Sequence, residues 1–197
     1  MKLLAFVDIH GSLKALKEIK DKVKRYNPDL IICAGDLSIF ENGLDYFVHQ
    51  LSKIKKPILF IHGNHESEEF FSEVCNLFPN TKFIHKKAHK IDNYIFLGYG
   101  GGGFSLEDKQ FEKAMKRLMK QVKDEKIILI THAPPHNTIL DKLDKEFAGN
   151  KSIRRFIENN NILVAISGHL HENAGKKDKI KNTLVINPGP MGKIIEI

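Results

Sequence analysis

The chain has 197 residues, of which 42% are hydrophobic and 28% charged, and its formal net charge is +7. That length can bury a core without disulfide bonds, which excludes the class of small disulfide-bonded domains. The longest apolar runs, such as 127–130, are far too short to cross a bilayer, which excludes a membrane-spanning class. No repeat or linker divides the sequence, so we expect residues 1–197 to form a single domain.

The first half of the chain predicts three strand–helix units. Continuous apolar runs predict buried strands, and apolar residues three and four positions apart predict the helices that follow them. The predicted strands are 2–7, 30–34 and 58–62, and the helices begin near Ser12, Leu44 and Ser67. The first run ends at Asp8 without a small-residue cleavage site, so it predicts a strand rather than a signal peptide.

The second half is richer in strands. The predicted strands are 82–85, 94–98, 127–130, 163–166, 183–186 and 193–197, with helices at 111–122 and 153–158. Buried strands that alternate with helices predict an α/β fold with a largely parallel sheet. The strand-rich last third predicts a second sheet or an antiparallel extension.

The positive charge permits an anionic partner such as nucleic acid, but its distribution does not favour one. The basic segments 20–25, 113–126 and 176–181 are spread along the chain and are not interleaved with aromatic residues, so we expect a solvated lysine-rich surface. Cys33 and Cys75 form no spacing motif and lie in apolar patterns. We expect them to be buried thiols in a cytoplasmic, reducing compartment.

Polar residues follow the last apolar residue of five predicted strands. The five segments are Asp8-Ile9-His10-Gly11, Gly35-Asp36, Gly63-Asn64-His65-Glu66, Thr131-His132-Ala133-Pro134 and Ser167-Gly168-His169-Leu170-His171. Taken singly, a Gly-Asp or Gly-Asn pair is common turn chemistry. Five such segments in order are not explained by turns. Because ligands bind outside the carboxyl ends of strands in open α/β sheets, we expect all five, on one sheet, to converge on one crevice.

These segments together offer two carboxylates, one amide oxygen and five imidazoles. The candidate donors are Asp8, His10, Asp36, Asn64, His65, His132, His169 and His171. Burying such groups without a partner is costly, so a metal is the natural partner. Nitrogen and oxygen donors without a thiolate suit manganese, iron, cobalt, nickel or zinc better than calcium or magnesium. Eight candidate donors are more than one tetrahedral ion can bind, so we predict two divalent ions. Manganese is the favoured metal. Alternation along a strand would place Asp8 and His10 on one face, and likewise His169 and His171.

The order D-x-H, G-D, G-N-H-[DE], H, G-H-x-H resembles that of the calcineurin-like metallophosphoesterases. The resemblance spans Asp8 to His171, and the chain length is similar to that of small prokaryotic members without a cap domain. It implies an αββα sandwich, in which two facing β-sheets are flanked by helices. The ligands it implies are Asp8, His10 and His171 for the first ion, Asn64, His132 and His169 for the second, and Asp36 as a bridge between them.

The resemblance also implies a mechanism. Two ions about 3.5–4 Å apart would share a hydroxide that attacks phosphorus in line with the leaving oxygen. Asn64 and His65 would stabilise the charge on the phosphoryl oxygens, and His65 would give a proton to the leaving group. Many family members have Asp after this histidine, whereas this chain has Glu66. If that carboxylate orients His65, the extra methylene group changes the geometry.

Loop residues near the strand ends are candidates for substrate binding. Phe40 follows Asp36, and His136 follows His132. Gly101 and Gly102 belong to a glycine-rich segment that lacks the ending of a P-loop, but glycine permits close approach to a ligand. His85 is expected in a solvated turn.

We therefore predict a phosphodiesterase that acts on a small or nucleotide-like phosphate ester, with phosphomonoesterase activity as the near alternative. A nuclease acting on DNA or RNA is a second class, although family nucleases usually add DNA-capping domains for which 197 residues leave little room. A non-catalytic scaffold, as in the retromer subunit of this fold, is a third class. That subunit lacks the catalytic histidine, whereas His65 is present here and every metal position is filled.

Overall fold

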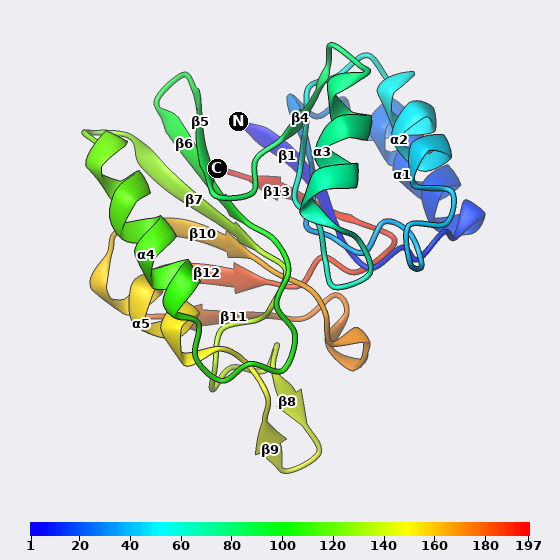
Figure 1. Ribbon diagram of the computed structural model, residues 1–197. Coiled ribbons are helices and arrows are strands. Elements are labelled where there is room, and N and C mark those ends of the chain that lie inside the picture. The colour runs from blue at the N-terminus through cyan, green and yellow to red at the C-terminus, as the bar shows by residue number, and fades with distance from the viewer.

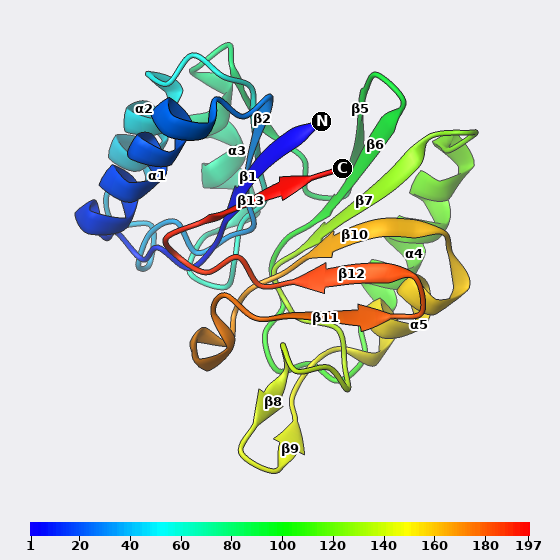
Figure 2. The ribbon, with the colours of Figure 1, turned by 180° about the vertical axis from the view of Figure 1, so that it is seen from behind.

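Two β-sheets face each other, and each carries helices on its outer side (Figures 1 and 2). The computed structural model describes all residues from 1 to 197. Its layer order is helices, sheet, sheet, helices. The αββα sandwich implied by the family resemblance is therefore confirmed.

The first sheet has five strands, and its order is β13-β1-β2-β3-β4. Their bounds are Lys193–Glu196, Lys2–Phe6, Leu30–Cys33, Ile58–Phe60 and Thr81–Phe83. β1 to β4 run parallel, and β13 pairs antiparallel with β1. The helices on its outer face are α1 (Leu13–Tyr26), α2 (Leu44–Ser52) and α3 (Glu68–Asn76). Two of the predicted helix starts are confirmed, because Ser12 and Ser67 accept hydrogen bonds from backbone N–H groups in the first turns of α1 and α3 and so cap these helices.

The second sheet has six strands, and its order is β11-β12-β10-β7-β6-β5. Their bounds are Lys177–Ile180, Thr183–Ile186, Ile162–Ile166, Lys126–Thr131, Tyr94–Tyr99 and Lys87–Ile91. The four inner strands run parallel, and both edge strands are antiparallel to their neighbours. The remaining elements are α4 (Lys109–Leu118), α5 (Lys151–Asn159), the 3-10 turns η1 (Met119–Gln121) and η2 (His171–Asn173), and the hairpin of β8 (Lys142–Leu143) and β9 (Glu146–Phe147). None of the helices is long and apolar enough to span a membrane.

The strand β1 shows why the predicted runs are continuously apolar. Leu3 and Ala5 pack between the two sheets, whereas Leu4 and Phe6 pack against the helices of the first sheet. Successive side chains of a strand point to opposite faces, so a strand that is covered on both sides is apolar at every position.

Three expectations need correction. The five polar segments do not follow strands of one sheet, because β1, β2 and β3 belong to the first sheet, and β7 and β10 to the second. The edge strands β5 and β11 were not predicted, since their exposed lysines interrupt the apolar pattern in the way that typically protects a sheet edge. His85 is not in a solvated turn, because it is 4% exposed and forms a bridge with Gly98 of β6.

Candidate metal centre

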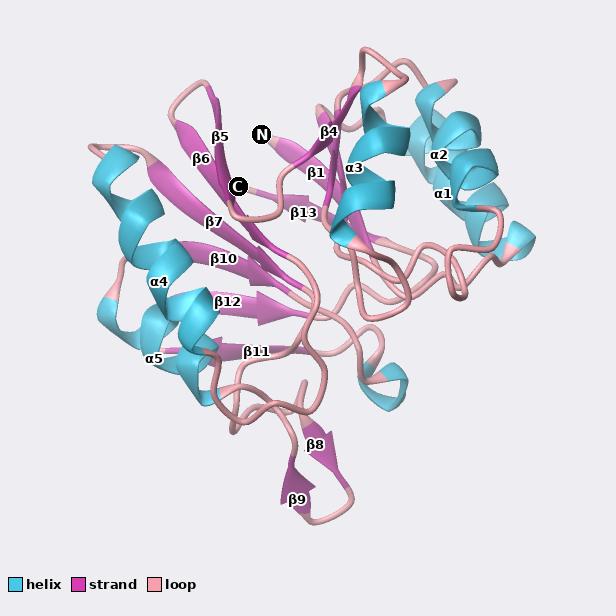
Figure 3. Cartoon of the chain, viewed as in Figure 1, coloured by secondary structure: helices cyan, strands magenta, loops and turns pink.

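The turns that follow five strands gather between the two sheets (Figure 3). They carry all eight candidate donors, which are Asp8 and His10 after β1, Asp36 after β2, Asn64 and His65 after β3, His132 after β7, and His169 and His171 after β10. The segments are far apart in the sequence. They meet because β1, β2 and β3 of the first sheet and β7 and β10 of the second present their carboxyl ends at the same end of the sandwich.

Several of these residues have an unusual backbone conformation. The φ angles of Asp8, His10, Asp36 and His169 are 56°, 43°, 50° and 71°. Non-glycine residues rarely have positive φ, and such residues concentrate at functional sites. The pairs Asp8–His10 and His169–His171 therefore lie in tight turns beyond the strands. The sequence predicted that the two members of each pair share one face of a strand. The turns bring them together instead.

The first group of donors is Asp8, His10 and His171. Their donor atoms lie within 4.8 Å of one another, close enough to hold a metal ion. The Nε2 atoms of His10 and His171 are 3.0 Å apart. Two imidazole nitrogens at that distance must share a proton or a cation, because two lone pairs cannot face each other without a partner.

The carboxylate of Asp36 lies between the first group and the other imidazoles. Its Oδ2 is 3.6 Å from Nε2 of His10 and 3.3 Å from Nε2 of His132. Its Oδ1 accepts a hydrogen bond of 3.0 Å from the backbone N–H of His65. Asp36 thus contacts imidazoles that come from both sheets.

Asn64 and two histidines form a second group. Oδ1 of Asn64 is 2.9 Å from Nδ1 of His169 and 3.1 Å from Nε2 of His132. The other ring nitrogen of His132, Nδ1, is 3.0 Å from the carbonyl oxygen of Ala34. A hydrogen bond from Nδ1–H to that carbonyl fixes the ring so that Nε2 faces the site, the arrangement typical of metal-binding histidines.

Burial and neighbouring charges set the protonation states of the site. Burial raises the pKa of Asp8 to about 6 and lowers the pKa of His169 to about 4. Burial also lowers the pKa of His10. Burial acts to raise the pKa of Asp36, but the hydrogen bond and charge of His132 outweigh it and bring that pKa to about 2. His10 and His169 are therefore neutral at pH 7, with lone pairs available to a cation.

Three buried atoms of the site have no hydrogen-bond partner in the protein. They are Oδ1 of Asp8, Nδ1 of His65 and Nε2 of His169. Unpaired buried acceptors are rare and costly in folded proteins. A divalent cation held by Asp8, His10 and His171 would satisfy Oδ1 of Asp8 and would replace the proton shared between His10 and His171. The donor set therefore fits metal ions.

The carboxylate of Glu66 forms no hydrogen bond with the ring of His65. It links the loops that surround the site. It accepts hydrogen bonds from the backbone N–H groups of Asp36, Ser38 and Gly63 at 3.2, 2.8 and 2.9 Å, and from the Ser38 hydroxyl at 3.0 Å. Glu66 is 7% exposed, and burial raises its pKa. The sequence placed this residue at the site but suggested a different partner.

The four loop residues proposed for substrate binding, Phe40, Gly101, Gly102 and His136, have different neighbours in the structure. The ring of Phe40 is 4.8 Å from the ring of His65. A Cβ atom on Gly102 would be 3.5 Å from Ala133, and one on Gly101 would be 3.0 Å from His62, so this loop passes beside the residue that follows His132. Nδ1 of His136 is 3.6 Å from Oδ2 of Asp141, and its ring is 6.0 Å from that of Phe147.

Comparison with known proteins agrees with this arrangement. Residues 1–173 match the family described as calcineurin-like phosphoesterase. The chain belongs to this family. Its members are metal-dependent phosphoesterases that typically bind two divalent metals. Three groups of side chains in this chain lie close enough together to hold a metal ion, and they are Asp8, His10 and His171, then His10, Asp36 and His65, then Asp8, Asp36 and His132.

Relatives of this chain include MJ1162 of Methanocaldococcus jannaschii, 36% identical over 96% of this chain and 88% of its own length. One component of the nuclease SbcCD of Staphylococcus epidermidis is 27% identical over 87% of this chain but only 43% of its own. A probable cyclic nucleotide phosphodiesterase of Synechococcus is 24% identical over 76% of this chain and 60% of its own. The solved structure of TT1561 from Thermus thermophilus has the same fold, with a TM-score of 0.79 at 19% identity over 96% of this chain and 89% of its own.

Replacing Glu66 with Gln tests its role as an anchor. Gln keeps one acceptor oxygen but presents an NH₂ group to backbone donors, so some N–H groups lose their partner. We expect the free energy of unfolding to fall by about 1–3 kcal/mol, and metal binding to weaken because Asp36 shifts. Chemical denaturation and metal titration measure both, with the exposed Glu73→Gln in α3 as the control. Wild-type stability and metal affinity in Glu66→Gln would show that these hydrogen bonds do not hold the site.

Proposed function

We propose that this chain is a dinuclear metal-dependent phosphodiesterase that hydrolyses a small or nucleotide-like phosphate ester. The observation that carries the proposal is the position of Asp36 between two groups of donors. One group is Asp8, His10 and His171, and the other is Asn64, His132 and His169. Each group would hold one ion, with Asp36 as the shared ligand. The nitrogen-rich donor set favours manganese, with iron, cobalt, nickel or zinc as alternatives.

Bound divalent ions would supply positive charge for the phosphoryl oxygens and would lower the pKa of an attacking water. The protein supplies the rest. The backbone N–H of His65 holds one oxygen of Asp36, which fixes the direction of the other oxygen. The carbonyl of Ala34 holds Nδ1 of His132 and so orients its ring. These contacts preorganise the site before an ester binds.

We assign His65 a role at the leaving group. Its ring lies 4.9 Å from the ring of His10, and its Nδ1 has no hydrogen-bond partner in the protein. A histidine that adjoins the donors while keeping a free ring nitrogen can give a proton to the departing oxygen or stabilise its charge. Its presence argues against a non-catalytic scaffold.

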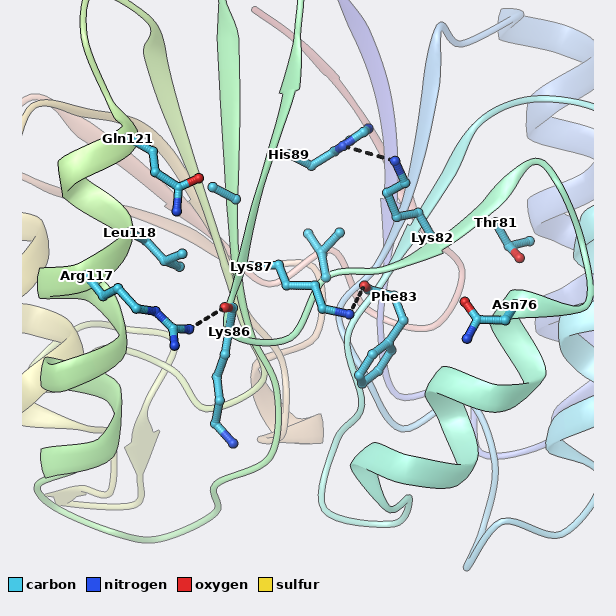
Figure 4. Close-up of a pocket in the computed structure, with 12 residues that line it drawn as sticks. Asn76, Thr81, Lys82, Phe83, Lys86, Lys87, His89, Arg117, Leu118 and Gln121 are labelled. Carbon is cyan, nitrogen blue, oxygen red and sulfur yellow. Dashed lines mark hydrogen bonds between the residues drawn. The ribbon is translucent and has the colours of Figure 1, made fainter.

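Nucleic acid is the alternative substrate, and one surface feature favours testing it. A pocket between the edge strands β4 and β5 is lined by Lys82, Lys86, Lys87 and Arg117 (Figure 4). Part of this charge is used within the protein, because Lys86 pairs with Glu68 at 2.9 Å. None of the candidate ligands lines the pocket. The nuclease component to which the chain is similar is more than twice as long as the aligned region.

The proposed function is tested by removing and restoring the metal. Chelation followed by dialysis should abolish hydrolysis of phosphodiesters, because attack and charge stabilisation both need cations. Mn²⁺, Co²⁺ or Ni²⁺ should restore it better than Ca²⁺, since imidazole ligands prefer these ions. Turnover of a panel of diesters, monoesters and single-stranded DNA measures class and substrate together. Full activity in metal-free protein would contradict the proposal, and a preference for DNA would favour the nuclease.

Two histidine variants separate catalysis from metal binding. His65→Ala should retain both metals and lower kcat by about 10²–10⁴-fold for an alkyl ester. The loss should be smaller for a nitrophenyl ester, whose leaving group departs without a proton. His132→Ala should instead lower metal occupancy and slow both esters alike. An equal loss of metal in the two variants would identify His65 as a ligand, and an equal loss of rate on both esters would identify it as a charge stabiliser.

A further inference from the structure

Two exposed phenylalanines adjoin the candidate metal centre from different loops. Phe40 lies between β2 and α2 and is 79% exposed, whereas Phe104 lies between β6 and α4 and is 66% exposed. The Phe40 ring is 4.8 Å from the ring of His65, and the Phe104 ring is 4.8 Å from that of His169. Single exposed apolar residues are ordinary, but two that each contact an imidazole of one site form an apolar rim that needs an explanation.

The turn that carries Phe40 has an unfavourable backbone for its sequence. Phe40 and Glu41 have φ angles of 47° and 65°, and the N–H of Asn42 donates to the carbonyl of Ile39 at 3.0 Å. A tight turn with two left-handed central residues normally has Asn and Gly there, because a Cβ atom disfavours that conformation. A bulky aromatic residue at such a position is strained, and its exposed ring gains little burial in return.

Neighbouring contacts hold this strained turn against the loop of His65. The N–H and the hydroxyl of Ser67 both donate to Oε1 of Glu41, at 2.8 and 2.5 Å. The N–H of Glu41 donates to the carbonyl of His65 at 3.2 Å. These hydrogen bonds fix the Phe40 ring beside His65.

The loop before Phe104 is anchored in a similar way. The N–H of Gly100 donates to Nδ1 of His85 at 2.7 Å, and the N–H of Gly101 donates to the carbonyl of His62 at 2.9 Å. A Cβ atom on Gly100 would be 2.5 Å from that carbonyl, so only glycine fits there. Residue Gly103 then passes close to His169, where a Cβ atom would be 3.9 Å from its ring. The loop is therefore held where Phe104 reaches the site.

We propose that Phe40 and Phe104 bind the two organic substituents of a phosphodiester, at least one of which carries an aromatic ring such as a nucleobase. The proposal rests on the phosphodiesterase function and names its substrate class. Phe40 contacts the substituent that leaves on the side of His65, and Phe104 contacts the substituent on the side of His169. A monoester has only one organic substituent and would leave one ring without a partner. Aromatic side chains stack on planar rings in a way that tolerates different bases.

The role of Phe104 is tested with two esters that share a leaving group. Thymidine 5′-(4-nitrophenyl phosphate) and methyl 4-nitrophenyl phosphate both release nitrophenolate, so their kcat/KM ratio reports on the thymidine group. Phe104→Ala should lower this ratio roughly 10-fold or more through KM, as expected for one lost stacking contact, and Phe104→Tyr should retain it. The control is Leu77→Ala, because Leu77 is 70% exposed at the far end of α3. An unchanged ratio in Phe104→Ala overturns this half of the proposal.

The role of Phe40 is tested by exchanging the leaving group. A chlorophenyl and a fluorinated alkyl methyl phosphate, chosen for leaving groups of matched acidity, differ in their aromatic ring but not in their need for a proton. Phe40→Ala should raise KM for the chlorophenyl ester and leave the alkyl ester nearly unchanged. An equal fall in kcat for both esters would show that the ring only positions His65, which overturns the proposal for Phe40.

A binding measurement distinguishes failure of this inference from failure of the proposed function. AMP and ribose 5-phosphate share a phosphate and a ribose and differ by the base, and calorimetry gives their affinities for the metal-loaded protein without turnover. We expect AMP to bind roughly 10-fold more tightly, with the difference reduced in a phenylalanine variant. Equal affinities in the wild type would overturn the inference, whether or not the protein hydrolyses diesters. If no phosphate ester is hydrolysed with any metal, the proposed function fails instead.

Discussion

The close contact between Asp36 and His132 is the interaction on which the site depends. Asp36 follows a strand of the first sheet and His132 a strand of the second, and the two side chains are 3.3 Å apart. His132 is fully buried and Asp36 is 2% exposed. A buried ionisable pair needs both of its members, because removing one leaves an uncompensated charge at a cost of about 3–5 kcal/mol. This contact therefore forms only when the two sheets are correctly aligned, so the geometry of the site depends on their packing.

Glycines make this approach possible. A Cβ atom on Gly63 would overlap the carboxylate of Asp36, and one on Gly35 would be 2.7 Å from Nδ1 of His132. A Cβ on Gly168 would overlap Val7, where the end of β10 meets the end of β1. The turns also place polar residues in left-handed conformations, which cost about 1–3 kcal/mol each. The apolar layers on both sides of the sheets offset this strain. The stable sandwich thereby tolerates strained turns at the carboxyl ends of its strands.

All of the candidate ligands could be named from the sequence, because they all follow strongly apolar strands. A run such as 127–130 marks the strand, and the polar residues that follow it, Thr131 and His132, mark its carboxyl end. The family resemblance then supplied the second sheet, which periodicity alone left open. The strands β5 and β11 were missed because edge strands carry lysines. The anchoring role of Glu66 could not be read from the sequence, because its partners are backbone groups of loops from two strand ends.

Other contacts depend on tertiary structure in the same way. His85 lies among lysines in the sequence, yet its ring is buried and accepts a hydrogen bond from Gly100. Nothing local indicates that a segment of basic residues will supply an anchor for a glycine-rich loop. Phe104 could have been noticed as an apolar residue directly after four glycines. Its position beside His169 follows only from the path of that loop.

The most direct test of the account is the metal stoichiometry of Asp36→Asn, measured by elemental analysis of protein saturated with Mn²⁺ and then dialysed. If Asp36 is the shared ligand, the wild type should retain about two ions per chain. The variant should lose affinity at both positions and retain well under two, while circular dichroism shows an intact fold. Two tightly held ions in a folded Asp36→Asn protein would contradict the central role of this carboxylate.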